Sequence, residues 1–192
     1  MLQQFGPEIW IADGPPVSAG GFHYGTRMAI IRLSDGSLFV WSPIQLTAGL
    51  RAEVDGLGDV RHLIAPNSLH HLFLDDWRRL YTRASLYAPP GLRRKRKDID
   101  FSGDLGNRPI AEWATDIDQV VVPGNFITTE VVFFHRKSAT VLFTDLIHNF
   151  LPTGFRVGDR LWRDGTSWWV QSRRYPESFA PCSSTAGPHA LH

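Results

Sequence analysis

The chain has 192 residues, of which 43% are apolar and 20% are charged, and its formal net charge is +1 at pH 7. This length and composition are typical of one soluble globular domain with a sizeable core, and they exclude a disordered chain. A net charge near zero gives no general attraction to nucleic acid or to an anionic membrane. The single cysteine, Cys182, excludes an internal disulfide framework and fits a reducing compartment.

The first ten residues, MLQQFGPEIW, lack the basic start and apolar run of a signal peptide. No stretch approaches the roughly 20 consecutive apolar residues that a membrane helix needs. We therefore expect a single domain over residues 1–192, located in the cytoplasm, with no membrane partner.

The first half of the chain is dominated by strand patterns. Segments 26–33 and 37–43 are rich in β-forming residues, and Asp35-Gly36 between them is a strong hairpin signal. Segment 45–58 has apolar residues at helical spacing and ends in glycine, and short buried-type strands are predicted at 59–66 and 84–89. This alternation of strand, helix and strand predicts a βαβ unit with some parallel sheet.

A second helix is predicted after Pro66, with Asn67 or Ser68 as its cap. Its apolar face is expected to contain Leu69, Leu72, Phe73, Trp77 and Leu80.

The second half of the chain begins with a charged run and then returns to strands. A strand is predicted at 119–124, and a hairpin is predicted from 125–135 and 139–145. The pattern weakens after residue 152, so residues 153–192 are expected to be divergent or poorly ordered. Two groups of strands with helices between them predict two sheets with helices packed outside, which is an α+β or a mixed α/β fold.

Histidines and one aspartate follow these strands at places where a sheet positions ligands. His70 and His71 follow the strand at 59–66, while His135 and Asp145 each end a strand of the second hairpin. His70, His71, His135 and Asp145 together form a nitrogen and oxygen ligand set suited to zinc, iron or manganese. Taken singly, the two adjacent histidines more often cap and solvate a helix start, and Asp145 is equally well placed to cap the turn before His148.

The basic run from Arg93 to Lys97 is the other candidate binding element. It has no interleaved aromatic residues, and Asp98 and Asp100 follow it at once. A solvated helix face is therefore favoured over nucleic-acid binding, which would require phosphate contacts that weaken with salt.

Three stretches together resemble a bacterial family of unknown function that is distantly similar to the metallo-β-lactamase superfamily. They are RMAIIRLSDGSLFVWSPIQL, GDVRHLIAPNSLHHLFLDDW and EVVFFHRKSATVLFTDLIHNF, and the resemblance runs from about residue 6 to about residue 150. It implies an αβ/βα four-layer sandwich, shortened at the carboxyl terminus, with a metal site at one edge of the two sheets.

The superfamily's central HxHxDH motif is only partly matched in this sequence. Pro66 and Ser68 stand where the motif has its first two histidines, and His70 stands where it has aspartate, so that only His71 matches. The resemblance further implies that His135 is the next ligand and that Asp145 is the aspartate that bridges two metals. The superfamily's final histidine has no match. Because the first metal position keeps only one histidine of three, at most one ion is expected, held by His70, His71 and Asp145 with His135 or His148 completing the site.

Two functions follow from this partial motif. The first is a metal-dependent hydrolase of a small-molecule substrate, in which Asp145 ligates or orients and His148 or His135 moves a proton. The second is a metal-free binding or interaction protein on the same fold, in which Asn67 and Ser68 become hydrogen-bond partners for the groups that lost their metal. A homo-oligomer is compatible with either function.

Overall fold

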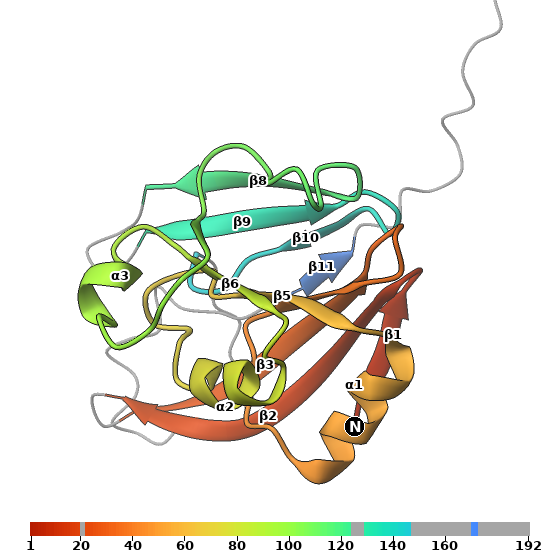
Figure 1. The fold of residues 1–192 in the computed structure, drawn as a ribbon, viewed down its shortest axis with the longest axis horizontal. Helices are drawn as coiled ribbons and strands as arrows, with labels where there is room; N and C mark the ends of the chain where they lie inside the picture. The colour runs from red at the N-terminus through yellow and green to blue at the C-terminus, as the bar shows by residue number, and fades with distance from the viewer. Residues whose placement is uncertain (20–21, 124–128, 147–169, 173–192) are drawn as a thin grey trace, which may run out of the picture.

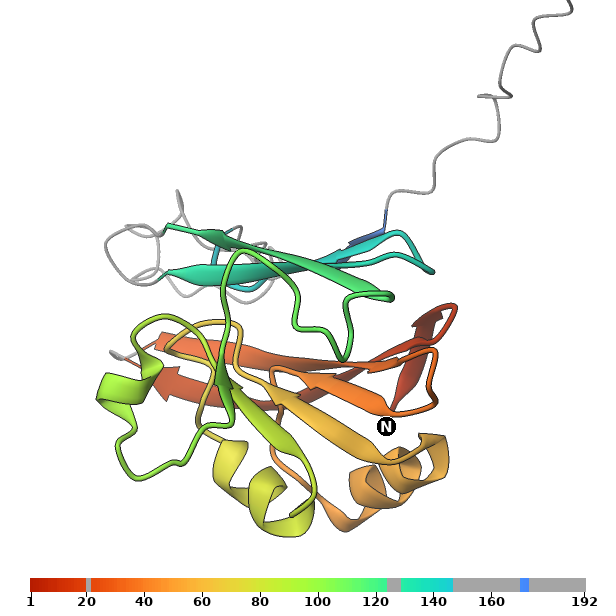
Figure 2. The same cartoon turned by 45° about the horizontal axis from the view of Figure 1, so that its top comes forward.

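A computed structural model describes residues 1–19, 22–123, 129–146 and 170–172. These residues form two β-sheets that lie face to face, and Figure 2 shows the smaller sheet above the larger one, with helices on the opposite side of the larger sheet. Within the described part of the chain, no helix has the length and the apolar character required to cross a membrane.

The larger sheet has seven strands in the order of the sequence. The strands are β1 (Gln3–Gly6), β2 (Ile9–Ala19), β3 (Phe22–Arg32), β4 (Leu38–Trp41), β5 (Val60–Ile64), β6 (Ser85–Ala88) and β7 (Gly103–Asp104). Strands β1 to β4 pair antiparallel, whereas β4 to β7 pair parallel. The predicted first hairpin and the predicted parallel unit are therefore both confirmed. The carboxyl ends of β4, β5 and β6 meet at one edge of this sheet, where α/β folds commonly place ligands.

The smaller sheet has four antiparallel strands in the order β11-β10-β9-β8. They are β8 (Ile117–Val122), β9 (Glu130–His135), β10 (Thr140–Leu142) and β11 (Val170–Ser172). The pairing of β9 with β10 confirms the predicted second hairpin, although both strands are shorter than expected.

Three helices connect the strands of the larger sheet (Figure 1). They are α1 (Ala48–Leu57), α2 (Leu74–Leu80) and α3 (Leu92–Lys95). The hydroxyl of Thr47 accepts a hydrogen bond from the amide of Leu50, so the predicted helix at 45–58 begins three residues later than expected. The basic run covers the last three residues of α3 and the two residues that follow it, and all of these side chains except Arg96 are exposed, as expected of a solvated face.

The second predicted helix begins later than expected, and the prediction that Leu69 and Leu72 lie on its buried face is wrong. Residues 68–73 form turns and α2 starts at Leu74, so His70 and His71 precede the helix. Leu69 and Leu72 are 42% and 58% exposed, whereas Trp77 is completely buried. The Asn67 side chain is the reason, because its Oδ1 accepts the amides of Leu69 and His70 and holds a turn instead of capping a helix.

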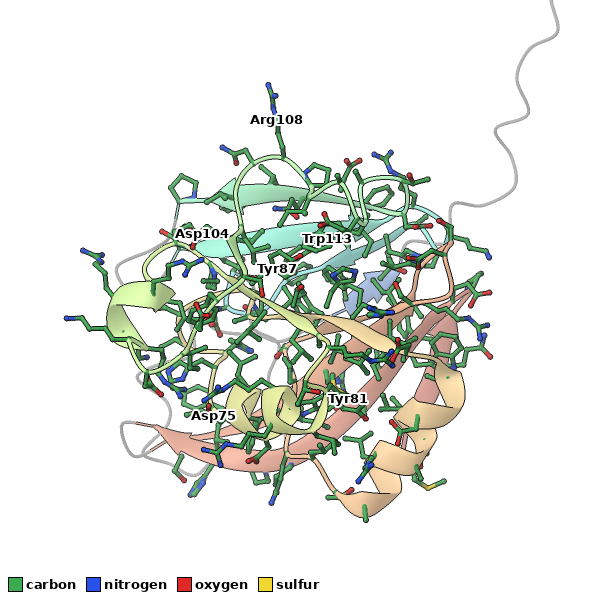
Figure 3. All side chains as sticks on the ribbon, viewed as in Figure 1. Asp75, Tyr81, Tyr87, Asp104, Arg108 and Trp113 are labelled. Atoms are coloured by element: carbon green, nitrogen blue, oxygen red, sulfur yellow. The ribbon has the colours of Figure 1, made fainter. Side chains whose placement is uncertain are left out.

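The core consists of two layers, one on each face of the larger sheet. One layer packs α1 and α2 against that sheet through residues such as Val54 and Trp77, and the other fills the space between the sheets. In the second layer, the Trp113 ring makes edge contacts with Phe39 and Tyr87 at ring-centroid distances of 5.1 and 4.8 Å. Figure 3 labels Trp113 and Tyr87. The two sheets are therefore held at a fixed separation beside the edge where the parallel strands end.

Candidate functional site

A cluster of buried polar side chains lies at the edge where β4 and β5 end. Its members come from both sheets, and we call it the edge cluster: Ser42, Asn67, His70, Glu130, Thr144 and Asp145. They are all buried or nearly so, since even the His70 and Asp145 side chains are only 10% and 12% exposed. Polar groups buried to this extent need partners, and the cluster members supply them to one another.

Asn67 joins the two sheets at this edge. It is fully buried, and its Nδ2 donates to Thr144 Oγ1 at 2.7 Å and to Asp145 Oδ2 at 2.5 Å. A β-bridge to Glu130 fixes its backbone at the same place. These contacts hold the loop after β5 against the turn after β10.

Glu130 holds that turn from the other side. Its two carboxyl oxygens accept the backbone amides of Thr144 and Asp145, the latter at 2.7 Å. Burial raises the pKa of Glu130, and Asp145 beside it acts in the same direction. The strand-like sequence around Glu130 gave no signal of this role, because it depends on which loop packs against the start of β9.

His70 is oriented by contacts on both ring nitrogens. Ser42 Oγ lies 2.8 Å from Nδ1, and Asp145 Oδ2 lies 3.5 Å from Nε2. Ser42 directly follows β4 and has a positive φ of 53°, a backbone conformation that is uncommon for a residue other than glycine. Strained positions of this kind cluster at functional sites, which marks Ser42 as part of the site although no sequence pattern pointed to it.

His70 Nε2 and Asp145 Oδ2 lie 3.5 Å apart, which is within the range of an ion pair and is also compatible with two ligands of one ion. A distance of 3.5 Å exceeds that of a good hydrogen bond. It is close to the roughly 3.4 Å that separates two ligands of one tetrahedral zinc ion, each about 2.1 Å from the metal. Within the residues that the structure describes, however, no group of three histidine, cysteine, aspartate or glutamate side chains is arranged to hold a metal. The described chain therefore offers two donors, and further ligands would come from water or from residues outside the described ranges.

His71 makes a different set of contacts. Its Nδ1 lies 3.1 Å from Nη1 of Arg96, whose guanidinium also pairs with Asp75 and Asp98. A guanidinium only donates hydrogen bonds, so Nδ1 must accept and the neutral ring carries its proton on Nε2. With Nδ1 engaged and Nε2 protonated, His71 has no lone pair free for a metal in this arrangement, and its assignment as a ligand stays a prediction.

The structure does not bring His135 to the edge cluster. His135 ends β9 and Glu130 begins it, which separates them by roughly 17 Å at the rise of an antiparallel strand. His135 was expected beside Asp145 because each ends a predicted strand of the same hairpin. Adjacent antiparallel strands end at opposite edges of a sheet, so Asp145 returns to the start of β9 and His135 stays beside Ser138. His148, the other predicted proton carrier, lies outside the described residues.

Comparison with known proteins identifies the architecture. No family model and no curated protein matches the chain. Among solved structures, the metallo-β-lactamase IND-7 aligns with a TM-score of 0.61 at 11% identity, over 81% of this chain and 76% of that one. The DIM-1 metallo-β-lactamase, from a crystal exposed to ceftazidime, aligns with a TM-score of 0.58 at 15% identity, over 80% and 73%. The chain has the metallo-β-lactamase fold.

The metallo-β-lactamase fold confirms the architecture that the sequence resemblance implied. At identities of 11% and 15% the likeness concerns the fold alone, and the activity of those two enzymes is not thereby carried over. The described residues account for the two sheets and for the helices on one side of them, while the expected shortening of the carboxyl terminus concerns residues that are mostly outside the described ranges.

Acid is expected to destabilise this fold through its buried histidines. Burial lowers the pKa of His62 and His135, and burial together with Lys95 and Arg96 lowers the pKa of His71 from 6.5 to about 4. The unfolded chain therefore binds more protons than the native state below about pH 6.5, and the free energy of unfolding falls as the pH drops toward about 4. His71 alone should account for up to about 2 kcal/mol of the loss between about pH 6.5 and pH 5.

Urea unfolding of the wild-type chain and of His71→Gln at several pH values measures this effect. The variant cannot titrate at this position, so its stability should depend less steeply on pH. Parallel pH profiles for the two proteins would contradict the assignment of a depressed pKa to His71.

Proposed function

We propose that the chain is a hydrolase whose reaction centre is the edge cluster, with one metal ion bound by His70 and Asp145. One observation carries the proposal. His70 Nε2 and Asp145 Oδ2 lie 3.5 Å apart, and both side chains are nearly buried at the edge where the parallel strands end. The metallo-β-lactamase fold supports the same reaction class, because it is the fold of metal-dependent hydrolases in the two enzymes compared above.

The residues of the edge cluster have separable roles in this proposal. An ion held by His70 and Asp145 would lower the pKa of a bound water and polarise the bond to be hydrolysed. His70 offers Nε2 as a ligand when Nδ1 carries the proton and donates it to Ser42 Oγ. The amide of Asn67 fixes one carboxylate oxygen of Asp145, and Glu130 fixes the backbone on which Asp145 stands.

Metal analysis tests the proposal directly. We expect protein purified without chelator to contain about one equivalent of zinc, iron or manganese, and His70→Ala and Asp145→Asn to lose most of it. His135→Gln is the matched control, because this buried histidine lies at the other end of β9 and should leave metal content unchanged. Metal-loaded protein should hydrolyse a nitrophenyl ester or phosphodiester, and His70→Ala should reduce the rate by about 100-fold or more.

Less than about a tenth of an equivalent of metal, with no uptake when zinc, iron or manganese is added, would contradict the hydrolase proposal. That result would favour the second candidate, a metal-free binding protein on the same fold. One observation supports this alternative: Asn67 already satisfies Asp145 and Thr144, so these buried groups have partners without any ion.

A further inference from the structure

The surface beside the edge cluster combines exposed leucines with positive charges. Leu69 and Leu72 flank the two histidines in the loop after β5, and they are among the few large apolar side chains that the described residues expose. The sequence predicted that both leucines are buried on a helix face. They are exposed because the Asn67 side chain holds this segment in a turn instead of a helix.

Helix α3 lies against this same loop. Lys95 Nζ donates to the carbonyl of Ser68 at 3.0 Å, and Arg96 Nη1 contacts the carbonyl of His71 at 3.4 Å. The basic run is therefore adjacent to the turn that carries Leu69 and Leu72, although more than twenty residues separate the two segments in the sequence.

The charges of the basic run are not all neutralised. Arg93 pairs with Asp104, and Arg96 pairs with Asp75 and Asp98. Arg94, Lys95 and Lys97 are exposed and form no ion pair with any residue in the described ranges. Lys95 contacts only a neutral carbonyl of the loop that carries the leucines, and its chain neighbours Arg94 and Lys97 add two more positive charges to the same segment. These three charges have no carboxylate partner among the described residues, and Asp100 is the one acidic residue of the segment that forms no ion pair within those residues.

We propose that this surface binds the substrate of the edge cluster, and that the substrate is a small anionic amphiphile, with an apolar chain lying on Leu69 and Leu72 and a phosphate or carboxylate held by Arg94 and Lys97. Charge complementarity and the juxtaposed leucines both favour such a molecule over a neutral polar one. This inference rests on the proposed function for the identity of the reaction centre, but the binding itself does not require hydrolysis.

Alkyl phosphates, used as single molecules below their micelle concentration, are the test ligands. Calorimetry should show hexyl phosphate binding about tenfold more tightly than ethyl phosphate, since each buried methylene strengthens binding and this surface covers the chain on one side. The double variant Leu69→Ser/Leu72→Ser should remove this chain-length dependence. Val120→Ser is the matched control, because Val120 is 48% exposed on β8 of the other sheet.

A second pair of substitutions tests whether the basic residues bind the phosphate group. Arg94→Gln/Lys97→Gln should weaken hexyl phosphate binding about tenfold and reduce its dependence on salt. Arg108→Gln, at an exposed arginine that Figure 3 shows pointing away from the body of the protein, should change neither quantity.

Two results would overturn the inference. One is equal binding of hexyl and ethyl phosphate by the wild-type chain, and the other is binding to anionic phospholipid vesicles with none to the monomeric ligands. Removal of metal with a chelator separates this inference from the proposed function, because the metal-free wild-type protein should lose hydrolysis while its hexyl phosphate affinity stays within about twofold of that of the metal-loaded protein.

Discussion

Replacing Trp113 with alanine is expected to lower the free energy of unfolding by about 4 kcal/mol, which is the largest effect of any single substitution we predict. Trp113 is completely buried between the sheets, where its ring meets Phe39, Tyr87 and His62 from three neighbouring strands. Truncation leaves a cavity that neither sheet can fill, because the strands on both sides are fixed by their own hydrogen bonds.

Chemical denaturation with two optical probes measures this loss. Trp113→Phe keeps most of the contact but leaves Gln119 Oε1 without the indole donor at 3.1 Å, so it should cost roughly 1–2 kcal/mol. Trp10→Ala, at a partly exposed tryptophan on β2, should cost less than Trp113→Ala. A Trp113→Ala protein within about 1 kcal/mol of wild type would show that this residue does not hold the sheets apart.

The second large effect is expected at Asn67. Asn67→Ala should lower the free energy of unfolding by about 3 kcal/mol, because it leaves the Thr144 hydroxyl, the Asp145 carboxylate and two loop amides without their present partner. Asn67→Asp should not restore stability, since a second carboxylate would then face Asp145 in a buried site.

Asn107→Ala is the matched control for Asn67. Asn107 is exposed and its side chain accepts one backbone amide, from Val121 at 2.9 Å, so its replacement should cost less than about 1 kcal/mol. Equal stability losses for the two alanine variants would contradict the role of Asn67 as the polar link between the sheets.

Local patterns were sufficient to predict most of the regular elements. Three of these elements depend on neighbouring residues, whose spacing and turn chemistry are visible in one sequence. They are the hairpin at Asp35-Gly36, the parallel unit around α1, and the hairpin of β9 and β10. The long strand β2 was not predicted, because Gly14, Pro15 and Pro16 interrupt its pattern. Its register shift between Gly14 and Val17 lets the strand continue past these residues.

The candidate site was predicted only in part. His70 and Asp145 were expected together and lie together, since each follows a strand that ends at the same edge. Asn67 was considered as a helix cap or as a hydrogen-bond partner, and the structure places it in the second role. Ser42 and Glu130 were missed because nothing in their own neighbourhoods distinguishes them from ordinary residues at strand ends.

The sequence by itself determined the fold class, the hairpins and the chemical nature of the candidate ligands, because these properties follow from composition and from short-range spacing. Only the tertiary structure decided which ligands meet. Because β10 runs antiparallel to β9, Asp145 lies beside His70 and far from His135. Because the segment of α3 packs on the loop after β5, Arg96 contacts His71. These two contacts join residues that are 75 and 25 positions apart, and a local pattern does not fix the distance between residues at such separations.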